Sequence, residues 1–492
     1  MPAWVRSERQ QDVAVLTIDN APVNVVISGV PEEIVAAIAA ANADAAVRAI
    51  VLQGKGRCFV AGADINQFTR GDMGDYLAAL MECNRAVEDS AKPVVAAIHG
   101  SALGAGLELS MSAHYRIFDA AATVGQPEVN LGLIPGAGAT QRLPRLVGAV
   151  KAAQMCALGG PIHAREAKAF GLADRVADDN LLRAAVSFAR EIADEPIPRT
   201  RERSDKLNLE DRGQLDRVRA VAQKKRVGEV APLAAIDAIE AALHLSFDDG
   251  LRREQELFQQ CLRAQAPAMI HLFFAERAAT KVPATPVPSA VEEDLSDGHE
   301  GQDQEQPDDA PPPEPSVLIF AKVADNILRK LEGVIYLDHA GTRLVEVVCG
   351  QRASAENISA AFAHAKSRGK APIMVRGYAG DRLFRILIEE ALRLVREGAG
   401  ITDVNNAMLR FGLATEPLIK DGNPPNDAFA PEEIIRRITD ALGAECARLV
   451  EEGVVDRASD LDLIAVLGYG YPAWRGGPVY SARTENAASP VT

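Results

Sequence analysis

The chain has 492 residues, of which 48% are hydrophobic and 25% charged, and its formal net charge is −15. This length predicts two to four globular domains, and the negative charge argues against a nucleic-acid-binding protein. Six scattered cysteines without a Cys-x-x-Cys pair favour reduced thiols over disulfides or a metal site. The sequence has no signal-peptide core, no apolar run of about 18 residues and no C-terminal Ser-Lys-Leu address, so we expect a cytoplasmic protein that does not enter a membrane.

Strand and helix patterns alternate along residues 1–195. Short apolar runs bounded by turn residues predict buried strands, and helical patterns lie between them. The predicted strands are 12–18, 48–54 and 93–100, and the predicted helices are 31–44 and 76–90. This alternation is typical of an α/β domain with a largely parallel sheet.

The composition changes twice after residue 195. Residues 196–281 have a charged, helical pattern and predict a helical connector. The segment 291–315 then contains ten Asp and Glu residues, no Lys or Arg, and five prolines. Such a composition cannot bury enough apolar surface to offset the entropy lost on ordering. We therefore predict a disordered acidic linker over 282–316, which supplies most of the net charge.

Beyond the linker, the sequence predicts a small α/β region followed by helices. Apolar runs predict strands at 317–320 and 333–337, and amphipathic patterns predict the helices. The predicted helices cover about 354–368, 381–397 and 430–452. We divide this part into residues 317–380 and a mostly helical region at 381–492.

Two acids stand beside Gly-rich turns in the first part of the chain. Gly104 permits a tight turn into a helix that begins near Ala105, where unpaired N–H groups favour negative charge. Glu108 lies one turn into this helix, and Glu128 follows Pro127 before a second Gly-rich helix start. Taken alone, each acid could equally be a solvated surface residue.

A third small-residue turn ends the segment 54–65, where Asp64 can cap the following helix. The three segments together closely resemble the enoyl-CoA hydratase/isomerase (crotonase) superfamily, in its order and spacing. The matching stretches are AGADI (61–65), ALGAGLEL (102–109) and GQPEVNLGLIPGAGATQRL (125–143). The resemblance covers about residues 8–190, and it implies a crotonase-type spiral α/β fold for residues 1–195.

The resemblance also implies the site. Glu108 and Glu128 are the expected catalytic residues, and the backbone N–H groups of Ala63 and Ala105 are the expected oxyanion hole for a thioester oxygen. Contacts with the acyl-CoA substrate are expected at Val23, Val25, Ala61, Asp64, Ile65, Gly104, Pro127 and Gly136. The family usually has Gly at position 105, so the methyl group of Ala105 could narrow the oxyanion site. No metal and no cofactor are expected, because the CoA thioester is itself the substrate.

The rest of the chain resembles a trimmed multifunctional enzyme of β-oxidation. Residues 196–281 resemble its helical connector, and residues 343–350 and 432–478 resemble parts of its 3-hydroxyacyl-CoA dehydrogenase. No Gly-x-Gly-x-x-Gly turn follows a strand, as a dinucleotide site requires. We therefore expect no NAD binding.

The dehydrogenase-like part also departs from the family at its catalytic positions. Glu346 matches the catalytic Glu, but the position of the catalytic His is Val334, and His339 is out of register. The family's Asn-Arg pair is Asp381-Arg382 here. The resemblance therefore implies an inactive dehydrogenase half.

Retaining both glutamates implies an enoyl-CoA hydratase, and two alternatives stay open. The same site could act as a Δ3,Δ2-enoyl-CoA isomerase, or the chain could be a non-catalytic acyl-CoA-binding scaffold. The helix at 430–452 keeps an apolar face that must be buried against the connector or another copy. The C-terminal region could thus self-associate or dock a separate dehydrogenase or thiolase. Nucleic acid and membranes are not expected partners.

Overall fold

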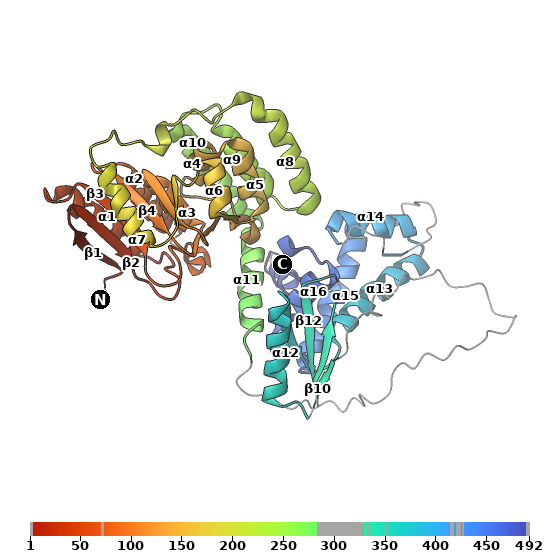
Figure 1. Cartoon of the computed structure of the whole chain (residues 1–492). Coiled ribbons are helices and arrows are strands. Elements are labelled where there is room, and N and C mark those ends of the chain that lie inside the picture. Colours follow the sequence, from red (N-terminus) through yellow and green to blue (C-terminus); the bar gives the residue numbers. More distant parts are fainter. Residues whose placement is uncertain are drawn as a thin grey trace, which may run out of the picture. The chain divides into compact units, whose positions relative to one another are not determined.

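Figure 1 shows the computed structural model of the chain. The structure describes residues 3–69, 73–282, 329–331, 334–339, 341–350, 352–413, 418–419, 425 and 428–488. They fall into two compact units, Met1–Pro267 and Ala268–Thr492. Residues 283–316 of the predicted linker lie outside the described residues. The predicted strand at 317–320 lies outside them as well. The five-part division made from the sequence stays a prediction.

A six-stranded sheet organises the first unit. Its order is β1-β2-β3-β4-β6-β9, and only β1 runs antiparallel to its neighbour. The strands are β1 (Val5–Gln10), β2 (Val13–Ile18), β3 (Ala49–Gly54), β4 (Val94–Ile98), β6 (Tyr115–Asp119) and β9 (Arg175–Ala177). The largely parallel sheet and its three predicted strands are confirmed. β2, β3 and β4 are almost entirely buried, as expected of parallel strands with continuous apolar runs.

Helices and a small second sheet surround the main sheet. Helix α7 packs its Ala185 and Phe188 against the central strands. The predicted helices correspond to α1 and α2. The elements are α1 (Val30–Ala43), α2 (Met73–Glu88), α3 (Ala105–Ser112), α4 (Ala139–Val147), α5 (Ala149–Leu158), α6 (Ala164–Phe170) and α7 (Leu181–Glu191), with strands β5 (Ser101–Leu103), β7 (Thr123–Gly125) and β8 (Ile162–His163).

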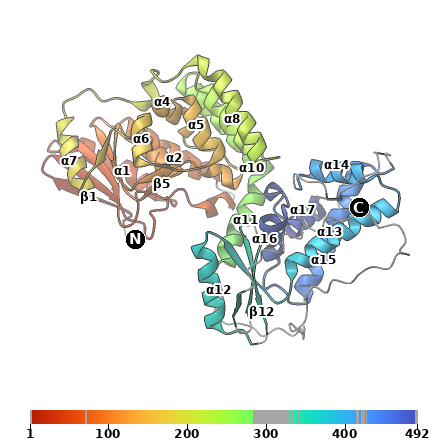
Figure 2. The ribbon, with the colours of Figure 1, turned by 45° about the vertical axis from the view of Figure 1, so that its right-hand side comes forward.

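Three helices of the predicted connector belong to the first unit. They are α8 (Arg212–Lys225), α9 (Ala231–Ala241) and α10 (Phe247–Ala264). They lie against α4 and α5 (Figure 2). The α/β core and these helices therefore form one compact body, and α10 comes within reach of the start of α4. The next helix, α11 (Ala266–Ala279), continues into the second unit.

The second unit joins a small sheet to a group of helices. Its sheet has the order β10-β11-β12-β13, in which only β12 and β13 are parallel. The strands are β10 (Arg329–Leu331), β11 (Val334–Asp338), β12 (Leu344–Cys349) and β13 (Ala371–Val375). The helices are α12 (Ala355–Ser367), α13 (Ala379–Arg396), α14 (Ile401–Phe411), α15 (Pro431–Glu451), α16 (Ala458–Tyr469) and α17 (Pro478–Ala488). The predicted helices correspond to α12, α13 and α15.

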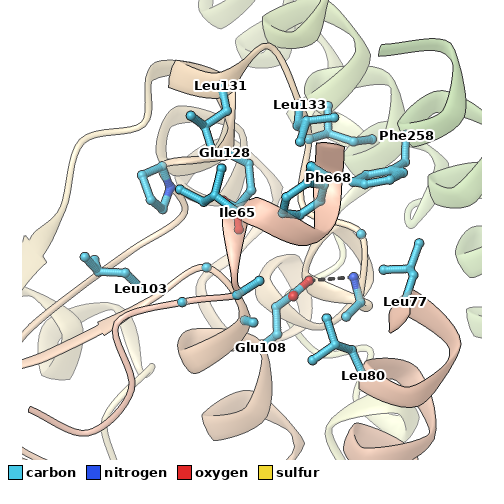
Figure 3. A pocket seen from close by; sticks show the side chains of 18 of the residues that line it. Ile65, Phe68, Leu77, Leu80, Leu103, Glu108, Glu128, Leu131, Leu133 and Phe258 are labelled. Carbon is cyan, nitrogen blue, oxygen red and sulfur yellow. Dashed lines mark hydrogen bonds between the residues drawn. The ribbon is translucent and has the colours of Figure 1, made fainter. Parts of the chain in front are cut away.

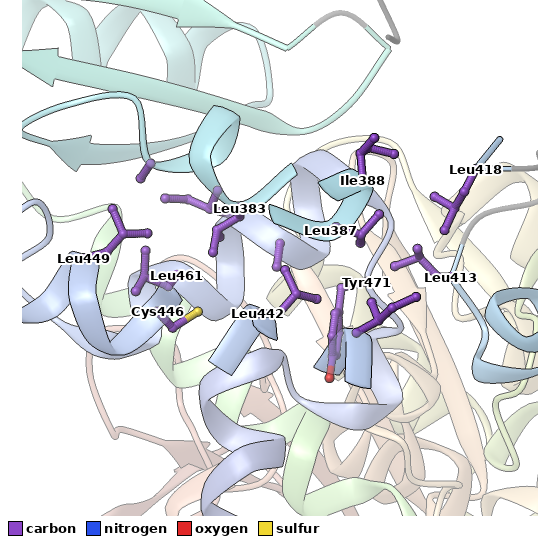
Figure 4. Packing of buried hydrophobic residues seen from close by; sticks show 14 of the residues in the cluster. Leu383, Leu387, Ile388, Leu413, Leu418, Leu442, Cys446, Leu449, Leu461 and Tyr471 are labelled. Atoms are coloured by element: carbon purple, nitrogen blue, oxygen red, sulfur yellow. The ribbon is translucent and has the colours of Figure 1, made fainter. Parts of the chain in front are cut away.

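The apolar face of α15 is buried inside the second unit. Leu442 and Leu449 pack with Leu383 and Leu387 of α13 and with Leu461 of α16 (Figure 4). This face therefore has partners within its own unit and does not require another copy of the chain.

The remaining sequence expectations concern cysteines, metals and membranes. All six cysteines are buried free thiols, as expected. Within the described part of the chain, no helix has the length and apolar character needed to cross a membrane. The same residues contain no cluster of three or more His, Cys, Asp or Glu side chains suited to a metal ion.

Candidate active site

Two backbone turns of the first unit bring Glu108 and Glu128 together. Helix α3 begins at Ala105, as predicted, and Glu108 lies in its first turn. Glu128 opens the short 3-10 helix Glu128–Leu131. Gly104 precedes α3 with a φ of +50°, and a Cβ there would approach Glu128 Oε1 to 2.6 Å. The positive φ favours glycine here, and any side chain at this position would displace the Glu128 carboxylate.

A cavity of about 100 Å³ is lined by the two glutamates and by a group of apolar side chains (Figure 3). The predicted site residues that line it are Ala61, Ala63, Ile65, Gly104, Ala105, Glu108, Pro127, Glu128 and Gly136. Its apolar wall is formed by Phe68, Met73, Leu77, Leu80, Leu103, Leu131, Leu133, Ile134 and Phe258. The two carboxyl groups therefore share a cavity whose lining is mostly apolar.

Three of the predicted contact residues, Val23, Val25 and Asp64, do not line this cavity. The Val23 carbonyl accepts a hydrogen bond from the Ala61 N–H (3.0 Å), and the Val25 carbonyl accepts one from Asn20 (2.6 Å). Asp64 caps the 3-10 helix Ile65–Thr69, as expected, by accepting from the Asn66 N–H (3.1 Å). A substrate contact at these three residues stays a prediction.

Two residues that line the cavity, Ala63 and Ala105, carry backbone N–H groups suited to an oxyanion hole. Ala63 pairs with Val26 in a parallel bridge, whose hydrogen bonds use the Gly62 carbonyl and the Asp64 N–H. The N–H of Ala63 is therefore directed away from Val26. Ala105 is the first residue of α3, where helical N–H groups have no acceptor within the helix. Among the described residues, neither N–H has a hydrogen-bond acceptor.

Glu108 is held by the start of helix α4. Its Oε1 accepts hydrogen bonds from the N–H groups of Ala137 (2.8 Å) and Ala139 (3.3 Å). Burial raises the pKa of Glu108 to about 6, although these N–H groups and the charge of Arg142 oppose the rise. The carboxyl group is therefore poised to lose and regain a proton near neutral pH.

Glu128 has a still more raised pKa. Burial raises the pKa of Glu128 well above its usual range, and the charge of Glu108 raises it further. With its amide nitrogen turned toward Glu128, Gln126 donates to both carboxylate oxygens at 3.1 Å. Because the two acids repel each other when both are ionised, ionisation of one carboxyl group opposes ionisation of the other.

A third buried carboxylate, Glu254 of α10, was not predicted from the sequence. Its Oε1 accepts from the Gly138 N–H (2.7 Å), and its Oε2 accepts from the N–H (2.9 Å) and hydroxyl (2.6 Å) of Thr140. Glu108 and Glu254 thus accept hydrogen bonds from alternate backbone N–H groups along residues 137–140, where α4 begins. Burial and the charge of Glu108 raise the pKa of Glu254 to about 8. A signal was present, because Glu254 interrupts the apolar stripe of Leu251, Phe258 and Cys261.

The turn before α4 is fixed from several sides. Asn84 donates to the Ala137 carbonyl (2.9 Å), and Gln255 of α10 donates to the Gly136 carbonyl (2.6 Å). Beneath it, Arg142 and Glu88 form a buried ion pair at 2.7 Å. The N–H groups that bind Glu108 therefore sit on a rigid support.

Comparisons with known proteins agree with this arrangement. The family model described as enoyl-CoA hydratase/isomerase matches residues 8–228. A probable enoyl-CoA hydratase of Bacillus subtilis is 47% identical over 176 residues, which cover 34% of this chain and 67% of that protein. The chain belongs to the enoyl-CoA hydratase/isomerase family.

Longer relatives match beyond the family model. The peroxisomal bifunctional enzymes of Danio rerio and Homo sapiens are 39% and 36% identical over 277 and 275 residues, or 55% of this chain. The matches cover only 38% and 37% of those enzymes. The crystal structure of an enoyl-CoA hydratase from Bacillus anthracis also matches, with 26% sequence identity and a TM-score of 0.38. The match covers 55% of this chain and 96% of the Bacillus anthracis chain.

In the second unit, the carboxylate of Glu346 pairs with His339. His339 Nε2 lies 2.8 Å from Glu346 Oε1, and Glu346 Oε2 accepts from the Gly380 N–H at 3.1 Å. Asp381 pairs with Arg385 at 2.6 Å. His339 is therefore a hydrogen-bond partner of Glu346. Its position along the sequence still differs from that of the family's catalytic His, which is Val334 here.

Proposed function

We propose that this chain hydrates 2-enoyl-CoA thioesters. The observation that carries the proposal is one cavity lined by Glu108, Glu128 and two backbone N–H groups without acceptors. The name of the Bacillus subtilis relative, which shares 47% identity with this chain, supports it. β-Oxidation or a related acyl-CoA breakdown is the setting that the multifunctional relatives suggest.

The residues present suit the charges that develop during hydration. Water adds to C3 of the enoyl group, and negative charge gathers on the thioester oxygen. The N–H groups of Ala63 and Ala105 would hold that oxygen, and each such donor is typically worth about 10²–10³ in rate. The ionised carboxylate of the pair accepts a proton from water, and the protonated one delivers a proton to C2. The products are the 3-hydroxyacyl thioester and the restored pair.

A two-substrate assay tests the proposal. The full chain is incubated with crotonyl-CoA and, separately, with a 3-enoyl-CoA, and loss or gain of the conjugated thioester is followed. We expect hydration of crotonyl-CoA. If the chain converts only the 3-enoyl thioester, the assigned activity is isomerisation instead of hydration. If it converts neither thioester, a non-catalytic acyl-CoA-binding role is favoured.

We further propose that the second unit is a dehydrogenase-like region without 3-hydroxyacyl-CoA dehydrogenase activity. Its helical architecture, together with the departures at Val334 and Asp381, supports that assignment. We expect no NAD binding, and titration calorimetry with NADH tests this directly. A micromolar dissociation constant would contradict it. The cytoplasmic location, and docking to a dehydrogenase or thiolase, likewise stay proposals.

A further inference from the structure

The connector helix α10 supplies one wall of the cavity. Phe258 of α10 lines the cavity together with Phe68, Leu77 and Leu80. Figure 3 shows Phe258 beside Phe68 and Leu77, across the cavity from Leu103. Phe258 is 2% exposed, and its ring centroid lies 6.4 Å from that of Phe68. The apolar lining thus includes a residue outside the stretch that matches the family model, which ends at residue 228.

This wall has little freedom to move. A Cβ at Gly136 would come within 2.8 Å of the Phe258 ring, so the ring packs directly on that backbone. One turn earlier on α10, Glu254 accepts hydrogen bonds from Gly138 and Thr140. Gln255 donates to the Gly136 carbonyl at 2.6 Å. Any retreat of Phe258 along with α10 would therefore break hydrogen bonds to the turn that also supports Glu108.

The volume available is small. The cavity measures about 100 Å³. An apolar cavity of about 150 Å³ accommodates benzene, with its six carbon atoms, so this one has room for about four. A longer acyl chain entering from the glutamates would meet Phe258, and protein interiors yield only at a cost when they are overpacked.

We propose that Phe258 restricts this chain to short acyl groups of about four carbons. The inference rests on the proposed hydration, since it names the substrate class of that same site. The connector then has a role in choosing the substrate, in addition to covering α4 and α5.

The test is a chain-length comparison with the full chain. The kcat/KM for crotonyl-CoA is measured against that for trans-2-decenoyl-CoA, and we expect the shorter thioester to be favoured by about tenfold or more. Phe258→Ala should lower this ratio by about tenfold, mainly by improving the longer substrate. Phe258→Leu, which removes less volume and preserves an apolar wall, should lie between them. Leu257→Ala is the matched control, because Leu257 is equally buried on α10 but does not line the cavity.

Two results would overturn the inference. One is a wild-type protein that prefers decenoyl-CoA or treats both thioesters alike. The other is an unchanged ratio in Phe258→Leu, which should fold even if Phe258→Ala does not. If the wild type hydrates neither thioester, the proposed function fails, and calorimetry with butyryl-CoA and decanoyl-CoA still decides about the pocket. Tighter binding of butyryl-CoA supports the role of Phe258, and equal binding contradicts it.

Discussion

Glu108 in the first unit and Glu346 in the second are both almost fully buried, and Glu108 lines the cavity of the first unit. Each accepts a hydrogen bond from a backbone N–H, Glu108 from Ala137 and Glu346 from Gly380. Around Glu346 the space is filled, since a Cβ at Gly380 would come within 2.5 Å of both its Oε1 and the Tyr469 hydroxyl. A buried acid is therefore a sign of chemistry only where a substrate has room to reach it.

The largest expected effect is a difference in hydration rate between variants of Glu108 or Glu128 and a variant of Glu346. Glu108→Gln and Glu128→Gln should each lower crotonyl-CoA hydration by about 10²–10⁴-fold, because each removes a proton donor or acceptor. Glu346→Gln should leave the rate unchanged. The assay is the loss of the enoyl thioester absorbance with each purified variant. Hydration at the parent rate by both first-unit variants would disprove the assignment.

Glu108 and Glu128 could be named from the sequence because the Gly-rich segments that carry them resemble the family, although each local turn alone was a weak signal. The glycine at 104 and the start of α3 are set by neighbouring residues, so their pattern can be read along the chain. Glu254 and Phe258 join the site only through the packing of α10 on α4, which no local pattern specifies. Both lie on a helix that the sequence did predict, but its buried face depended on tertiary contacts.

The His339–Glu346 pair was missed for a related reason. Counting back from Glu346 to Val334 assumes that the partner comes from a fixed distance along the chain. In the hairpin of β11 and β12, Leu337 stands opposite Glu346. Because side chains alternate between faces, a residue two positions past Leu337 returns to the same face, and that residue is His339.

The second largest effect concerns Glu254. Glu254→Ala removes the acceptor of two N–H groups and one hydroxyl, all buried, and should destabilise the first unit by about 3 kcal/mol. Trp4 and Trp474 are the two tryptophans of the chain. Urea unfolding followed by fluorescence in a Trp474→Phe background reports the first unit through Trp4.

The matched control for that measurement is Glu256→Ala. Glu256 lies on the same helix but is exposed, and it forms an ion pair with Arg253 at 2.8 Å. Its removal should change the free energy of unfolding by about 0.5 kcal/mol or less. Equal effects of the two substitutions would show that the contacts of Glu254 with α4 contribute nothing to the stability of the unit.

A smaller effect is the pH dependence of the unfolding free energy of the first unit. The pKa of Glu254 is raised to about 8 in the folded protein, so the folded state holds this proton more tightly than the unfolded state does. The stabilisation is complete below the unfolded pKa of about 4.3 and is lost as pH rises toward the folded pKa, by at most about 1.4 kcal/mol per pH unit. Glu254→Gln cannot titrate, so its unfolding free energy should fall less between pH 5 and pH 7.5. Parallel pH profiles would refute the raised pKa.

The smallest expected effect concerns the contribution of the His339–Glu346 pair to the stability of the second unit. His339→Ala removes one side-chain hydrogen bond to Glu346 and should destabilise the second unit by about 1 kcal/mol, with no change in crotonyl-CoA hydration. Urea unfolding in a Trp4→Phe background reports this unit through Trp474. A double-mutant cycle with Glu346→Gln separates the pair from its surroundings, and we expect a coupling of about 1 kcal/mol. Because Glu346 keeps the Gly380 N–H when His339 is absent, a loss much above this value would mean that His339 supports more of the unit than its one partner.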